Sequence, residues 1–258
     1  IRTEPRSGKL ATVRILGPSA ERPGLLEPAP PLADQLRAMV RDADIVEGRR
    51  ARDVADEAEA EVLQTIHDLP GGGDLAIEPT RALVAIDVDL GERKGSDAKR
   101  ITRQANMAAL SEAARLLRLK ALGGIVVLDL VGRGHDATAL VNAARTAFAP
   151  DNPGVAIGPV SKFGTMEMTI PRRTRPVAEI LGEGARMLSD QTLALRMIRR
   201  LQDEAAAQGG ARFIVRCPAE VARSAEPYAA LLAQRIGARF VIQPEAGMAR
   251  DAFVVGAA

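Results

Sequence analysis

The stretch LVAIDVDLGERKG, residues 83–95, is an apolar strand that ends in acidic residues and a turn. Side chains alternate along a strand, so the two valines and the isoleucine share one face, while Asp87 and Asp89 share the other. The stretch GGIVVLDLVGRG, residues 123–134, repeats this pattern and places Asp129 at the end of a second apolar run. The sequence therefore predicts two strands that are buried on one face and end in carboxylates.

A long helix is predicted between these two strands, over residues 98–122, with Ser96 or Asp97 as its N-cap. Strand, long helix and strand form the crossover unit that joins parallel strands. Parallel neighbours lie about 4.8 Å apart, which would bring Asp129 beside the first two aspartates.

The remaining periodicity predicts a mixed α/β chain. A helix is expected over residues 51–67, and further core strands are expected at 75–78, 155–160 and 165–170. A second unit is expected near the C-terminus, with strand 211–216, helix 219–235 and strand 239–243. The predicted fold class is α/β, a mixed-sheet core with crossover helices plus a small C-terminal α/β domain.

Composition describes an ordinary globular protein, with 47% hydrophobic and 26% charged residues among 258. Aromatic residues make up only 2%, which argues against a recognition surface built on stacked rings. The single cysteine, Cys217, excludes an internal disulfide and fits a reducing compartment, so a cytoplasmic location is predicted. No apolar run reaches the length of a membrane span, so no membrane partner is expected.

Converging carboxylates repel one another unless a cation lies between them. All-oxygen ligands favour Mg²⁺, with Mn²⁺ as the alternative, over zinc. Mg²⁺ commonly binds one or two carboxylates together with substrate phosphates, which is the chemistry of phosphodiester cleavage. The plainer interpretation is that these aspartates cap loops at strand ends, and the spacing alone leaves both open.

Four motifs, in order, carry a resemblance to a known family: GGGDLAIEPTRALVAIDVD, NMAALSEAARLLRLKALGGIVVLDL, VSKFGTMEM and RTRP. Together they resemble the catalytic core of the ribonuclease E/G family from about residue 70 to residue 176. Residues 213–242 resemble the family's small C-terminal domain more weakly. The resemblance implies a truncated sensor-like region over 1–69, a metal-dependent nuclease core over 70–180 and a small α/β domain over 181–258.

Within that resemblance, Asp87 and Asp129 match the two aspartates that bind the catalytic Mg²⁺. Asp89 stands where the family ordinarily has an asparagine that orients one of them, so the chain gains a negative charge there. The implied activity is Mg²⁺-dependent endonucleolytic hydrolysis of single-stranded RNA to 5′-phosphate and 3′-hydroxyl ends, in RNA processing or decay. The alternative is an RNA-binding or ribosome-associated factor that keeps the fold and cleaves poorly.

Residues for RNA contact are expected at the start of the chain and near the end of the matched core. Arg2 and Thr3 resemble the pair with which the family grips a 5′ monophosphate, although its second arginine would fall near Gly154. Four basic residues on loops after the core strands are expected either to meet RNA phosphates or to be solvated surface charge: Lys162, Arg172, Arg173 and Arg175. The basic residues of the long helix, Arg115, Arg118 and Lys120, are predicted to form an outward polar face.

The family's paired-cysteine zinc link should follow RTRP, where this chain has VAEILGEGARMLSDQT, without Cys or His. No zinc is therefore expected. The resemblance also implies a homodimer through the C-terminal domain.

Overall fold

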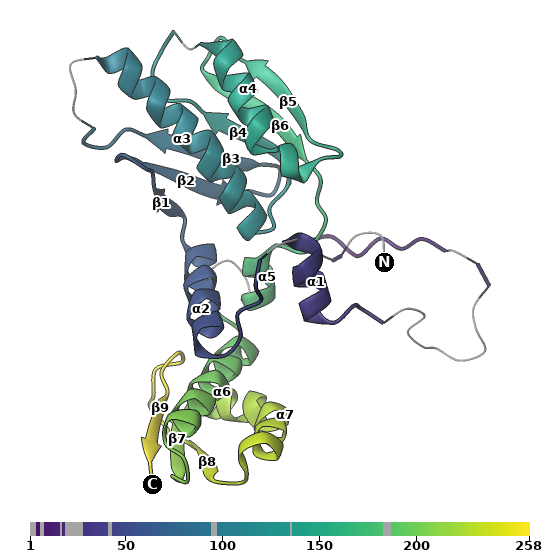
Figure 1. The fold of residues 1–258 in the computed structure, drawn as a ribbon, viewed down its shortest axis with the longest axis vertical. Coiled ribbons are helices and arrows are strands. Elements are labelled where there is room, and N and C mark those ends of the chain that lie inside the picture. Colours follow the sequence, from purple (N-terminus) through teal and green to yellow (C-terminus); the bar gives the residue numbers. More distant parts are fainter. Residues whose placement is uncertain are drawn as a thin grey trace. The chain divides into compact units, whose positions relative to one another are not determined.

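The computed structural model describes residues 4–5, 8–15, 17–18, 28–40, 43–93, 97–134, 136–182 and 187–258. The chain divides into two compact units, residues 1–177 and residues 178–258 (Figure 1). The first unit holds a six-stranded sheet and the second a three-stranded sheet, each with helices. The predicted fold class is confirmed. Arg2 and Thr3 lie outside the described residues.

The elements of the first unit follow one another in this order: α1 (Leu32–Met39), α2 (Arg49–Leu63), β1 (Ile66–Asp68), β2 (Asp74–Pro79), β3 (Val84–Asp89), α3 (Ala98–Leu119), β4 (Gly124–Asp129), α4 (Ala137–Ala147), the 3-10 turn η1 (Ala149–Asp151), β5 (Ala156–Val160) and β6 (Thr165–Ile170). From the unit boundary onward the order is α5 (Val177–Leu181), α6 (Asp190–Ala207), β7 (Phe213–Cys217), α7 (Ala219–Ile236), β8 (Phe240–Pro244) and β9 (Val254–Ala257).

The six-stranded sheet has the order β1-β2-β3-β4-β6-β5. β3 and β4 run parallel and are joined by α3, as the crossover unit predicts, while the other neighbouring pairs are antiparallel. Asp97 accepts the backbone N–H of Arg100 at 3.0 Å and so caps the start of α3. Asp136 caps α4 in the same way through the N–H of Ala139.

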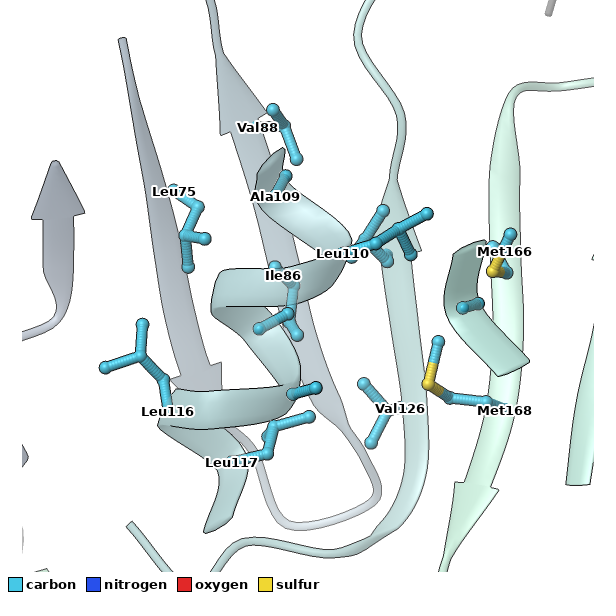
Figure 2. Close-up of a cluster of buried hydrophobic side chains, with 14 of the residues drawn as sticks. Leu75, Ile86, Val88, Ala109, Leu110, Leu116, Leu117, Val126, Met166 and Met168 are labelled. Carbon is cyan, nitrogen blue, oxygen red and sulfur yellow. The ribbon is translucent and has the colours of Figure 1, made fainter. Parts of the chain in front are cut away.

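The core of this unit lies between the sheet and α3. The helix buries Ala109, Leu110 and Leu117 against Ile86 and Val126 of the two parallel strands (Figure 2). Small alanines on the helix let it approach the sheet closely, and each large side chain buried here contributes about 1.5–3 kcal/mol. The parallel pair is thereby held at the centre of the unit.

Helix α4 packs onto the same core through Leu140, Ala144 and Phe148. Both α3 and α4 therefore cover the face of the sheet that carries Ile86. The alternate side chains are exposed or half-buried, and Glu167 of β6 is among the exposed ones. We call this solvent-exposed side of the six-stranded sheet the open face.

Edge strand β1 was predicted to be the end of a helix, and that prediction was wrong. The helix over 51–67 ends at Leu63, and Ile66–Asp68 pair with β2 instead. The N–H of Ile77 also donates to the carbonyl of Thr65 at 2.9 Å, which begins the sheet before the named strand. Pairing with β2 thus overrides the helical period, and it buries His67.

Lys120 contradicts the predicted outward polar face of α3, because its side chain is buried. Its ammonium donates to the carbonyls of Val62 at 2.8 Å and Gln64 at 2.6 Å, with Glu61 at 3.3 Å, and so caps the end of α2. Burial lowers the pKa of Lys120 to about 8. Arg115 remains half-exposed and pairs with Glu61 and Glu112, beside the buried ring of His67, whose pKa is lowered by burial.

The second unit is a three-stranded sheet in the order β8-β7-β9, with α6 and α7 packed on it. β7 and β8 are parallel and are connected by α7. Its core contains Met197, Leu201, Phe213 and Cys217, and burial raises the pKa of the Cys217 thiol. Among the helices that the structure describes, none is long and apolar enough to cross a membrane.

Candidate metal centre and nucleic-acid interface

The central feature of the open face is a pair of carboxylates. Asp87 of β3 and Asp129 of β4 are direct register partners in the parallel ladder. Both are exposed, whereas Ile86 and Leu128, their preceding neighbours, are buried on the opposite face. Adjacent strands lie about 4.8 Å apart, so both carboxylates can reach one ion. The expected juxtaposition is present, and neither side chain points into the hydrocarbon core.

More acids surround this pair on the open face. Thr165 of β6 pairs with Asp129, and Ala76 of β2 pairs with Asp87. The face also carries a wider set of carboxylates from four strands: Asp68, Asp74, Glu78, Asp89 and Glu167. Their summed negative potential attracts a cation and repels a bare phosphate backbone.

The donor set fits Mg²⁺, an ion that often binds only one or two protein carboxylates and completes its shell with water and substrate phosphates. In the described part of the chain, no group of three or more His, Cys, Asp and Glu residues is arranged to hold a metal. An ion here would therefore rest on Asp87 and Asp129 and take its other oxygens from outside the protein.

Asp89 lies on the same face as Asp87, two residues further along β3. Its register partner on β2 is Asp74. One of its carboxylate oxygens accepts the backbone N–H of Gly91 at 2.6 Å. This is the loop-capping role that was the plainer interpretation of the sequence. Asp89 therefore fixes the end of β3, and its support of a metal stays a prediction.

The end of β3 is clamped by the preceding glycine-rich loop, residues 69–73. Gly73 has φ +71°, and a Cβ there would lie 2.3 Å from the carbonyl oxygen of Asp89. The guanidinium of Arg93 donates to the carbonyls of Gly72 at 2.5 Å and Pro70 at 2.8 Å. Only glycine permits this close approach, which explains part of the GGGD motif.

The end of β4 is held by Asn106, a residue that the sequence analysis did not single out. Asn106 is fully buried on α3; its amide donates to the carbonyl of Val131 at 3.0 Å and its oxygen accepts the Val131 N–H at 3.1 Å. Val131 lies two residues after Asp129, so Asn106 fixes the path of the chain leaving the site. A polar residue on the apolar stripe of a helix was the available signal.

The hairpin between β5 and β6, residues 161–164, lies at the same end of the sheet. The N–H of Leu130 donates to the carbonyl of Gly164 at 3.1 Å, which ties the hairpin to the residue after Asp129. Lys162 and Phe163 project from it, with the ammonium 4.9 Å from the ring centroid. The structure thus brings Lys162 near the carboxylate pair, together with an exposed ring that the sequence analysis missed.

The three predicted arginines lie at the other end of the sheet. Ile170, just before them, pairs with Gly124, five residues along β4 from Asp129, a separation of about 17 Å. Arg172 donates to the carbonyl of Gly123 at 2.7 Å and Arg173 to that of Asp151 at 2.6 Å. The backbone N–H of Arg175 donates to the carboxylate of Glu4. The structure does not bring these arginines to the carboxylate pair, and their contact with RNA stays a prediction.

Comparison with known proteins gives a consistent result. The sequence matches the profile of the Ribonuclease E/G family over residues 29–173. It is 32% identical over 148 residues to Ribonuclease E of Haemophilus influenzae, covering 53% of this chain and 16% of the relative. It is 31% identical over 148 residues to Ribonuclease E of Escherichia coli, covering 53% and 14% respectively.

A plant relative, the chloroplastic Ribonuclease E/G-like protein of Arabidopsis thaliana, is 34% identical over 113 residues, or 42% of this chain and 11% of that protein. The aligned segments thus span only a small part of each relative. The family match covers more than half of this chain and includes Asp87, Asp129 and the hairpin 161–164. On this match and this sheet, the chain belongs to the ribonuclease E/G family.

Proposed function

We propose that the chain is a Mg²⁺-dependent endoribonuclease that hydrolyses single-stranded RNA to 5′-phosphate and 3′-hydroxyl ends, in RNA processing or decay. The observation that carries this proposal is the register pairing of Asp87 and Asp129, both exposed at the carboxyl ends of parallel strands. Membership of a ribonuclease family supports the choice of RNA over other phosphodiesters.

Asp87 and Asp129 would hold the ion, with Mn²⁺ as the alternative metal. When bound, the metal supplies a water of lowered pKa and neutralises charge on the reacting phosphate. Asp89, through its hydrogen bond to Gly91, fixes the turn that follows β3. Asn106 does the same for the chain after Asp129. In the reaction the water oxygen bonds to phosphorus, the P–O3′ bond breaks, and the 3′ oxygen gains a proton.

A cleavage assay with matched variants tests the proposal. An unstructured, 5′-labelled RNA is incubated with wild type, Asp87→Asn and Asp129→Asn in Mg²⁺, in Mn²⁺ and in EDTA. We expect cleavage by wild type only with metal, and a loss of about 100-fold or more in either variant, the scale of removing one group that stabilises transition-state charge. Glu78→Gln is the matched control, since it removes an acid of the same open face that is a register partner of neither aspartate.

Metal binding is measured separately by titrating MnCl₂ into each protein in a calorimeter. One site in wild type and Glu78→Gln, weakened in both aspartate variants, is expected. Equal cleavage by the aspartate variants and wild type contradicts the nuclease proposal. Tight RNA binding without cleavage in any metal supports the rival, an RNA-binding or ribosome-associated factor. Preference for a DNA oligonucleotide of the same sequence redirects the proposal to another phosphodiester.

A further inference from the structure

Phe163 is the one exposed aromatic residue of the chain. The sequence holds five phenylalanines and one tyrosine, all of them described, and the other five rings are buried or half-buried. The side chain of Phe163 is 81% exposed, at the tip of the hairpin 161–164. Among its phenylalanine and tyrosine rings the protein thus leaves only Phe163 largely exposed to solvent, and an exposed ring is a stacking surface for a flat partner.

The hairpin that carries this ring is stabilised by hydrogen bonds to Ser161. The Ser161 hydroxyl accepts the N–H groups of Phe163 and Thr165, both at 3.2 Å, and lies 2.8 Å from the Thr165 hydroxyl. The N–H of Gly164 donates to the Ser161 carbonyl at 3.1 Å. The ring is therefore presented by an ordered turn, which reduces the entropy lost when a ligand binds.

The position of the hairpin relates the ring to the carboxylate pair. Thr165, two residues after Phe163, is the register partner of Asp129. The N–H of Leu130 and the carbonyl of Gly164 join the hairpin to the end of β4. Phe163 thus lies on the hairpin next to the candidate metal centre, at the same end of the sheet.

Lys162 adds a positive charge to the ring. Its ammonium lies 4.9 Å from the ring centroid, within the range of a cation–π contact. The ammonium lies over one face of the ring, which leaves the opposite face for a flat base, while the ammonium itself attracts an anionic phosphate. On an otherwise acidic open face, Lys162 is placed where a phosphate backbone could approach.

We propose that Phe163 and Lys162 form a platform for one nucleotide of single-stranded RNA, adjacent to the phosphodiester that a metal on Asp87 and Asp129 would hold. Phe163 stacks on the base, and Lys162 contacts the flanking phosphate. The platform rests on the proposed function and deepens it, since a base inside a duplex has no free face to stack on. The platform thereby selects unpaired RNA through contact with a base, in addition to contacts with the RNA backbone.

The test measures RNA binding in the Asp129→Asn background, which is expected to leave the RNA uncut. Oligonucleotides carry 2-aminopurine at each position in turn, because stacking on an aromatic ring quenches its fluorescence. We expect Phe163→Leu to weaken binding about 5- to 150-fold and to abolish quenching at one or two adjacent positions. Phe163→Trp keeps both. We expect Lys162→Gln to make the salt dependence shallower, reducing the magnitude of the slope of log affinity against log salt concentration by about 0.7.

Ile125→Ala is the matched control, because Ile125 is half-exposed on β4 of the same face, at its opposite end. Thermal melts of every variant show that folding is retained. Unchanged affinity and quenching in Phe163→Leu overturn the platform, as does the absence of RNA binding by wild type. A Phe163-dependent dimer seen by light scattering overturns it as well, since the ring then serves a second copy of the chain.

Failure of the platform and failure of the nuclease proposal give different results. If Phe163→Leu leaves RNA binding unaltered in the Asp129→Asn background and leaves cleavage unaltered in the otherwise wild-type protein, the platform is wrong and the nuclease proposal stands. If wild type cleaves nothing, yet Phe163-dependent quenching persists, the platform stands on an RNA-binding protein.

Discussion

Replacing Asn106 with leucine should destabilise the first unit and loosen the chain beyond Asp129. Asn106 is fully buried and makes two hydrogen bonds, of 3.0 and 3.1 Å, to the carbonyl and N–H of Val131. A buried polar group left without its partner costs about 1–3 kcal/mol. Two such groups set an upper range of about 2–6 kcal/mol, but Val131 is only half-buried, so water can reach it. We therefore expect a loss of about 2 kcal/mol.

In a unit of this size, 2 kcal/mol corresponds to a fall in Tm of about 4–8 °C. Calorimetry measures the Tm, and hydrogen exchange measures protection of the Val131 amide, which should fall in the variant. Gln104→Leu is the control, a polar-to-apolar change at an exposed position of α3. Asn106→Asp keeps the acceptor for the Val131 N–H and loses the donor to its carbonyl. If Asn106→Leu melts within 1 °C of Gln104→Leu, the two hydrogen bonds do not hold this segment.

The buried Lys120 has a pKa of about 8, against an ordinary value of 10.5. Between these two pH values the unfolded chain binds more protons than the folded chain. The free energy of unfolding should therefore rise with pH, by up to about 2 kcal/mol from pH 8 to 10. Urea unfolding at four pH values compares wild type with Lys120→Met, and the same rise in both would contradict this origin. Gly73→Ala should cost at least about 2 kcal/mol, because its Cβ meets the Asp89 carbonyl and its φ is +71°. Gly209→Ala, where a Cβ meets nothing within 4 Å, serves as the reference in thermal melts. The homodimer through residues 181–258 stays a prediction, which the mass from light scattering checks against that of one chain.

The parallel pair could be predicted because its signals are local. The alternation in AIDVD and VVLDL assigned each aspartate to the exposed face, and the helix between them required a parallel crossover. Register was the remaining unknown. In the structure, the parallel ladder pairs Asp87 directly with Asp129.

What the sequence could not predict depends on contacts between distant segments. β1 forms because β2 offers it a partner, and no period within residues 51–68 indicates that. Lys120 is buried because the end of α2 supplies carbonyls far away in sequence. A lysine at the end of a helix gives no hint of such a cap. The role of Asn106 likewise depends on Val131, on another element.

Asp87 and Asp129 point outward because side chains alternate along β3 and β4. The site is therefore sensitive to the insertion or deletion of a residue within either strand. Deleting a single residue within β4 would shift every following side chain to the other side of the sheet. Asp129 would then turn toward Leu110 and its neighbours, and an apolar residue would take its place in water. The sheet itself, rather than a flexible loop, therefore sets the spacing of the acids.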